Sequence, residues 1–211
     1  QAAFNISTGQ KNVAIGSENL YTATTASSNV AVGYNSLFGT TTGSYNVGVG
    51  EGSLQANTTA SNTTAVGYQA MYSNTTGYGT AVGANALDAN TTGTHNTSIG
   101  STSLSANSTG SYNSALGHQA LASNTTASQN TAVGYQAAYT ATTGGSNTAM
   151  GYRSLRSLTT GSGNTALGMH SLYSSTTAVY STAVGHEALY QSTANLNTAV
   201  GFQSARATTS G

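Results

Sequence analysis

The chain has 211 residues, a formal net charge of zero and only 4% charged residues, against about 25% in an ordinary globular domain. So little charge argues against nucleic acid or an anionic membrane as a partner, and no apolar run approaches the roughly 20 residues needed for membrane insertion. The absence of Cys excludes disulfides and thiol chemistry, and the first residue, Gln1, indicates a processed product or a fragment.

A pentapeptide similar to NTAVG recurs along the whole chain, first at 12–16 and last at 197–201. Its closing glycines are 17 residues apart nine times and 16 residues apart twice. They are Gly16, Gly33, Gly50, Gly67, Gly83, Gly100, Gly117, Gly134, Gly151, Gly168, Gly185 and Gly201. Units this short are well below the about 33 residues of helix-pair repeats, so stacking of small coils into a solenoid is favoured.

Two columns of large apolar residues accompany the glycines, and we expect both to be buried. The column directly before the Gly includes Ile15, Val32, Val49, Val66, Val82, Ile99, Leu116 and Val133. The column four residues after the Gly includes Leu20, Leu37, Leu54, Leu87, Leu104 and Leu121. Two such residues per unit cannot close a core alone, so each unit has to bury its apolar face on its neighbours.

Segments such as TAVG favour strand, whereas SNTTGS-like segments are rich in turn residues. We therefore predict an all-β parallel β-solenoid, or β-roll, of about twelve 17-residue coils that forms a single domain over residues 1–211. Each coil should contribute two or three short strands, and a spacing of ~4.8 Å gives a rod roughly 58 Å long. The repeated Gly should mark a corner with positive φ or close backbone approach.

Asparagine opens most of the pentapeptides, and two interpretations of it are open. Inside a turn, its amide can bond the backbone and the next coil, which forms an Asn ladder. The alternative is N-glycosylation, because the N-x-S/T pattern occurs in several places. These are Asn5, Asn57, Asn62, Asn74, Asn90, Asn96, Asn107 and Asn124.

Tyrosine recurs at fixed positions of the repeat, which makes it the most informative residue type for a surface function. The candidate interface or surface-binding aromatics are Tyr34, Tyr68, Tyr135 and Tyr152 just after the Gly, and Tyr72, Tyr139, Tyr173 and Tyr190 four residues further on. A third set comprises Tyr45, Tyr78, Tyr112 and Tyr180. Stacking between coils and packing between chains is one interpretation, and an exposed strip that binds sugars or surfaces is the other.

Adjacent threonines such as Thr58-Thr59 also recur, and one Thr of each pair should form an outward ladder. Such a ladder, together with the low charge, keeps an ice-binding function open, although the repeat lacks a Thr-x-Thr face. The few acids and histidines are scattered over different coils. His118 and His186 share a column, but four coils, or ~19 Å, separate them. We therefore expect no catalytic, metal or cofactor site and no enzymatic activity.

The units NVAIG at 12–16 and NVAVG at 29–33 resemble the head repeats of YadA-type trimeric autotransporter adhesins. Similar NTAVGYQAL-type arrays occur in bacteriophage tail fibres. The resemblance implies a left-handed parallel β-roll, three chains wide, that binds extracellular matrix or host surfaces. The chain departs from the adhesin pattern in its longer period and in Thr at positions such as Thr64, Thr131 and Thr165.

We accordingly expect a structural fibre or adhesion protein, a homotrimeric rod of a phage tail fibre or surface adhesin. Its location would be extracellular, on a cell surface or in a virion, and its other partner a cell-surface glycan or matrix. The chain opens and closes in mid-repeat, at Gln1 and Gly211, which predicts a segment of a longer fibre or a subunit that stacks end to end. A self-assembling extracellular filament subunit is the first alternative, and an ice-binding solenoid is the second.

Overall fold

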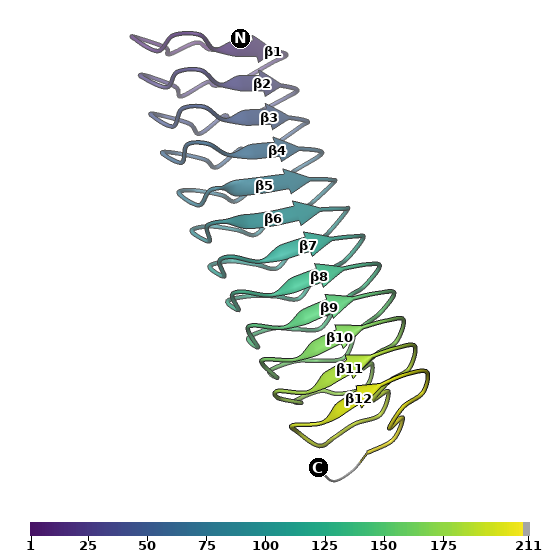
Figure 1. Ribbon diagram of the computed structural model, residues 1–211. Helices are drawn as coiled ribbons and strands as arrows, with labels where there is room; N and C mark the ends of the chain where they lie inside the picture. The colour runs from purple at the N-terminus through teal and green to yellow at the C-terminus, as the bar shows by residue number, and fades with distance from the viewer. Residues whose placement is uncertain (209–211) are drawn as a thin grey trace.

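The structure is a computed structural model that describes residues 1–208 as one solenoid with a strand in each of its repeats (Figure 1). The strands are β1 (Val13–Ile15), β2 (Val30–Val32), β3 (Val47–Val49), β4 (Thr64–Val66), β5 (Gly79–Val82), β6 (Asn96–Ile99), β7 (Ser114–Leu116), β8 (Thr131–Val133), β9 (Thr148–Met150), β10 (Thr165–Leu167), β11 (Thr182–Val184) and β12 (Thr198–Val200). The predicted end of the chain in the turn column, at Gly211, lies outside the described residues.

All twelve strands belong to one parallel sheet, in which each strand pairs with its neighbours in sequence order. The register follows the repeat, because Ala14 lies opposite Ala31 and each further step is one unit of sequence. A step of 16 residues joins β4 to β5, where Ala65 lies opposite Ala81. The prediction of a parallel β-solenoid of about twelve coils is therefore confirmed. No helix occurs between residues 1 and 208, and so none there could cross a membrane.

Each coil contains one strand, so the prediction of two or three strands per coil is wrong. The reason lies in the residues two and four positions after the repeat Gly, which have left-handed backbone conformations. Asn35 and Leu37, for example, have φ values of 55° and 53°, which no β-strand accommodates. The coils are nevertheless hydrogen-bonded outside the sheet. The Leu37 amide donates to the Ser53 carbonyl at 2.9 Å, and the Thr41 amide donates to the Thr58 carbonyl at 2.9 Å.

The core column that precedes the Gly was predicted incorrectly. Leu116 is 48% exposed and Ile15 is 59% exposed. The same outward column contains Val82 and Ile99, which are exposed, and Val32, Val49, Val66 and Val133, which are half-buried. Successive side chains of a strand point to opposite faces, so this residue and its buried neighbour cannot both face inward. The inward position belongs to the middle residue of the strand, which is Ala, Gly or Ser in every coil.

The column four residues after the Gly is buried as predicted and forms the centre of the rod. Leu20, Leu37, Leu54, Leu87, Leu104 and Leu121 are all fully buried. The small residue in the middle of each strand, such as Ala115, faces the same interior. A large side chain from the turn side and a small one from the sheet side therefore fill each layer. Burial of one leucine contributes about 1.5–3 kcal/mol, and stacking repeats that contribution along the rod.

Buried asparagines form two ladders, of which the first is the predicted one. Its Oδ1 atoms accept from the backbone of the next coil, as in the 2.8 Å bond from the Asn46 amide to Asn29. The second ladder was missed. In it the Asn107 side-chain amide donates to Asn90 Oδ1 at 3.0 Å and to the Gly110 carbonyl at 3.0 Å. It comprises Asn57, Asn74, Asn90, Asn107 and Asn124.

The buried ladders bear directly on the glycosylation alternative. An asparagine whose amide is enclosed between coils cannot carry an oligosaccharide in the folded protein. That excludes six of the eight acceptor patterns, namely Asn57, Asn74, Asn90, Asn96, Asn107 and Asn124. Asn5 and Asn62 are exposed.

The glycine that closes each strand is required for both of the predicted reasons. Gly100 has a φ of 132°, which residues with a side chain rarely adopt. A Cβ at this position would lie 2.6 Å from the Gly117 carbonyl oxygen of the next coil. Close backbone approach therefore fixes the stacking distance at this corner, and the repeat preserves glycine there.

Candidate functional surfaces

The sheet presents one face to solvent, which we call the outer strand face. It consists of the first and last residues of each three-residue strand, and of Thr80, Val82, Thr97 and Ile99 in β5 and β6. The last residue is always Val, Ile, Leu or Met, and the outward residue two positions before it is Val in β1–β3 and Thr or Ser from β4 onward. None of these positions carries a charge. The result is a continuous neutral stripe of aliphatic and threonine side chains along the rod.

The outer strand face is large for an exposed apolar surface. With ~4.8 Å between strands and ~3.3 Å per residue, the strip over the three strand positions measures about 58 by 10 Å. Its area is therefore on the order of 600 Å², somewhat below the ~800 Å² that each partner contributes to a standard protein interface. Soluble monomers rarely expose contiguous apolar patches of more than a few hundred Å².

The column of residues directly after the Gly borders the outer strand face and contains the first set of predicted aromatics. Tyr135 and Tyr152 stack with their ring centroids 5.3 Å apart, and His118 stacks on Tyr135 at 5.6 Å. Tyr34 and Tyr68 are each 48% exposed, and no stacked ring is found for them within residues 1–208. This column therefore contains both paired rings and rings with an open face.

The second predicted set of tyrosines lies on the turn side of the coil and is half-buried. It comprises Tyr72, Tyr139, Tyr173 and Tyr190. Tyr173 and Tyr190 stack at 5.1 Å, and Arg206 lies over the Tyr190 ring with its guanidinium carbon 4.9 Å from the centroid. The third set is the most open, since Tyr45 and Tyr180 are largely exposed. Stacking between coils accounts for part of the tyrosine pattern, whereas the exposed rings are available to a partner.

The threonine pairs divide between the two sides of the backbone. The first Thr of a pair bonds the next coil, as Thr58 Oγ1 donates to the Thr75 carbonyl at 3.1 Å. The second Thr of the pair, such as Thr59, is exposed. Only one hydroxyl per pair is therefore available to solvent, and it forms the predicted outward ladder.

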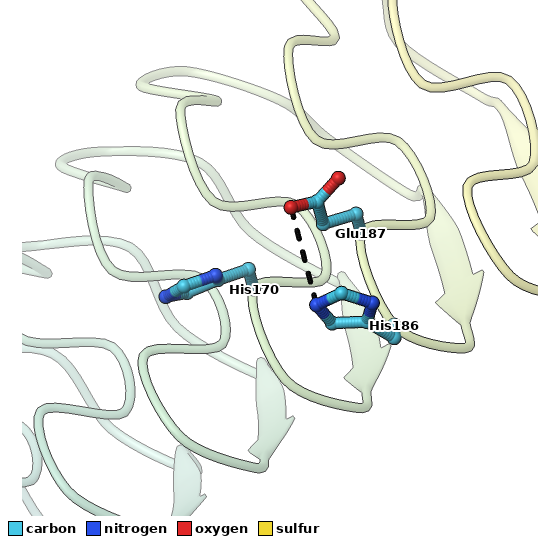
Figure 2. Close-up of side chains that lie close together, drawn as sticks. All are labelled: His170, His186 and Glu187. Atoms are coloured by element: carbon cyan, nitrogen blue, oxygen red, sulfur yellow. Dashed lines mark ion pairs between the residues drawn. The ribbon is translucent and has the colours of Figure 1, made fainter.

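One cluster of ionisable side chains interrupts the repeat near the C-terminal end of the described chain (Figure 2). One ring nitrogen of His170, one of His186 and a carboxylate oxygen of Glu187 lie within 4.8 Å of one another. The expectation that the scattered histidines could not be brought together is wrong for this pair. His170 and Glu187 both occupy the second position after a repeat Gly in adjacent coils, and His186 immediately precedes Glu187.

Hydrogen bonds between coils position this cluster. The His170 amide donates to the Tyr152 carbonyl and the Glu187 amide donates to the Met169 carbonyl, both at 3.0 Å. These bonds place the two side chains one above the other along the rod. The His186 ring stacks on Phe202 at 5.4 Å, and the His170 ring meets Tyr173 edge-on at 4.9 Å.

Two of the three groups have perturbed acidities. Hydrogen bonds from Arg206, at 2.9 Å, and from Gln203 hold the pKa of Glu187 below its usual value. Burial, and then the charge of Arg153, lower the pKa of His170. The Nε2 atom of His170 is itself buried and has no hydrogen-bond partner. At neutral pH the cluster therefore combines a carboxylate with a neutral imidazole.

The remaining acids stand apart from this cluster. Burial raises the pKa of Asp88, whose Oδ1 atom is enclosed without a hydrogen-bond partner.

No pocket is found over residues 1–208. Comparisons of the chain with family models, with curated proteins and with solved structures give no match. The resemblance to adhesin heads and tail fibres therefore stays a prediction.

Proposed function

We propose that this chain is a structural segment of a fibre, which assembles with copies of itself through the outer strand face and serves as a rigid spacer for surface attachment. The observation that supports the proposal most strongly is the uncharged character of that face along the whole sheet, with one of its two columns aliphatic throughout. A second copy is the occupant that fits best, because the same stripe on another chain is equally long, flat and neutral. Neither stripe would bury an unpaired charge in such an interface.

The proposed assembly is a homotrimer, and the proposed setting is extracellular, on a cell surface or in a virion. The repeated NTAVG-like units favour this setting through their resemblance to adhesin heads and phage tail fibres. Attachment would use cell-surface glycan or matrix, for which Tyr34 and Tyr68 offer open ring faces beside the outer strand face. The rod would act without catalysis or a cofactor in this role.

The mass of the assembly in solution tests the proposal. Sedimentation at micromolar concentration should give three times the mass of one chain, and Leu116→Lys should shift it to the mass of one chain. Lysine in the centre of an apolar interface would be desolvated without a partner, whereas in the free rod it stays in water. The matched control is Thr76→Lys, because Thr76 is exposed on the turn side, away from the outer strand face.

Each outcome of this experiment separates two interpretations. A single-chain mass for the unmodified protein, or no response to Leu116→Lys, would contradict the proposed interface. Open-ended polymers would instead favour the self-assembling filament subunit. Circular dichroism of both variants should match that of the parent chain, since neither substitution touches the interior.

Ice binding is the second candidate function, and the threonine column of the outer strand face favours it. From β4 to β12 the first strand residue is Thr in every strand except β6, where it is Asn, and β5 and β7, where it is Gly and Ser. In β5 and β6 the register places Thr80 and Thr97 in the same column. The adjoining outward column is aliphatic rather than threonine, so the flat Thr-x-Thr face is still lacking. Thermal hysteresis measured on the unassociated Leu116→Lys rod and on the parent tests ice binding. Hysteresis would support it, and its absence from both proteins would contradict it.

A further inference from the structure

We propose that His170, His186 and Glu187 bind one divalent transition-metal ion, with Zn²⁺ as the ion to which the ligand set is best suited. Two imidazoles and one carboxylate are a known protein ligand set for zinc with a fourth position open to solvent or another ligand. The site borders the outer strand face without belonging to it, and the proposal is independent of the proposed function. It applies to a single chain, because two adjacent coils supply all three groups.

The three ligand atoms already lie at short range from one another. His186 Nε2 and Glu187 Oε1 are 3.9 Å apart, and the largest separation in the set is at most 4.8 Å (Figure 2). Bonds of about 2.0–2.2 Å to zinc place tetrahedral ligand atoms about 3.3–3.5 Å apart. An inward movement of roughly 1 Å closes that difference, which side-chain rotation supplies. All three residues are half-buried.

The carboxylate is oriented by partners of its own, as is common for metal ligands. Gln203 and Arg206 both donate to Glu187 Oε2, each at 2.9 Å. This leaves Oε1 directed at His186. The Glu187 carboxylate also offsets the positive charge of Arg206, with which it is paired. A bound cation would therefore meet an ionised carboxylate and not an unpaired arginine. Two aromatic contacts, to Tyr173 and Phe202, restrict the imidazoles in a similar way.

The cluster is a departure from the repeat, which sets it apart from the structural columns. The second position after the Gly is Gln in four other coils, namely at Gln69, Gln119, Gln136 and Gln203. In the coils of β10 and β11 it is His170 and Glu187 instead, with His186 alongside. The same column accepts Glu18 and Arg153 as well, so an ionisable residue there is not unusual by itself. Within residues 1–208 only His170 and Glu187 come together with a histidine of the adjoining column. Metal binding does explain that combination.

The test is calorimetric titration of the full chain with zinc chloride after treatment with a chelator. We expect one ion per chain. His170→Gln, Glu187→Gln and His186→Tyr should each weaken binding at least about tenfold, the range seen when even outer partners of metal ligands are removed. These replacements use residues that other coils have at the same positions, such as Gln136 and Tyr135, so the stack should accept them. Circular dichroism checks that each variant is folded.

The matched control is His118→Tyr, which removes a histidine from the same column as His186 but outside the cluster. It should leave zinc affinity unchanged. A second readout is the visible absorption of bound Co²⁺, which should appear with the parent chain and be lost in His170→Gln. Absence of binding to the parent, the same affinity in the three cluster variants as in the parent, or a stoichiometry of one ion per three chains would overturn the proposal.

Discussion

The inside and the outside of the rod follow different rules. The inward leucine column is occupied by Leu in most coils, with Met71 and Ala138 among the replacements, whereas the outward position just after the Gly varies widely. Ser17, Tyr34 and Glu51 occupy that outward position in three consecutive coils. Each inward residue must fit between identical neighbours above and below, so a change in one coil disturbs three. An outward residue has no such packing restriction. Chemistry specific to this chain should therefore be sought among the outward residues that differ from the repeat.

The strongest test of this contrast uses two glycines. Gly100→Ala should lower the free energy of unfolding by about 3–5 kcal/mol, because the new Cβ combines a φ of 132° with a 2.6 Å approach to the next coil. Gly52→Asn should change it by no more than about 1 kcal/mol. Gly52 occupies the column in which Asn35 and Gln69 already have left-handed backbones.

Urea unfolding followed by circular dichroism measures both variants. Equal destabilisation of the Gly100 and Gly52 variants would show that stacking distance at the corner does not control stability. The Gly52 variant should be tolerated, because the atoms nearest to its new Cβ, at 3.3–3.4 Å, belong to side chains that can move.

Two leucines give the next largest effect. Leu104 is fully buried and Leu116 is 48% exposed, although both belong to repeated apolar columns. Leu104→Ala should cost about 3 kcal/mol, because it opens a cavity between coils. Leu116→Ala should cost less than about 1 kcal/mol in the dissociated chain and should weaken self-association instead. Unfolding and sedimentation of the same two proteins separate these effects, and a large loss of stability in dissociated Leu116→Ala would contradict the assignment of this column to the surface.

The second asparagine ladder offers a smaller effect. Asn107→Ala should destabilise the chain by about 1–2 kcal/mol, because the buried Gly110 carbonyl and the amides of the neighbouring rungs lose a partner. Asn62→Gly is the control, since Asn62 is exposed and Gly accepts its φ of 60°. Thermal unfolding should show a lower midpoint for Asn107→Ala only.

The repeat alone was sufficient to predict the solenoid, its parallel register and the buried leucines. Periodicity does not define which face of a strand is inside, and the prediction that Val32 and Leu116 lie in the core was therefore wrong. The alternation of Thr-Ala-Val contained the correct answer, because only a small middle residue can face a leucine across so narrow a coil. The single strand per coil was not predictable in the same way. It depends on left-handed conformations at residues such as Leu37, which are unusual for leucine.

Two further features were present in the sequence but were interpreted differently. Asn57 and its equivalents were considered only as matches to the N-x-S/T pattern, the basis of the glycosylation alternative, yet their recurrence every 16 or 17 residues is the signal of an inner ladder. The histidines were compared only within one column, so His170 and His186 were not considered together. Adjacent columns of adjacent coils are also close neighbours, and this proximity brings His170 together with His186 and Glu187.

The smallest predicted effect is the pH dependence of folding stability that His170 causes. Its pKa in the folded chain lies below the ordinary value of 6.5, first because of burial and then because of Arg153, with His186 adding to the effect and Glu187 opposing it. Above 6.5 the imidazole is neutral in both the folded and the unfolded chain. As the pH falls below that value the unfolded chain takes up the proton first, so stability decreases until the folded pKa is passed.

Thermal unfolding in the presence of a chelator at about pH 7.5 and about pH 5 should therefore show a lower midpoint in acid, and His170→Gln should reduce the difference. Nuclear magnetic resonance should show His170 titrating below a free imidazole, and Arg153→Gln should raise its pKa by removing a nearby positive charge. Titration of His170 at or above the ordinary value would mean that the ring is not enclosed as described.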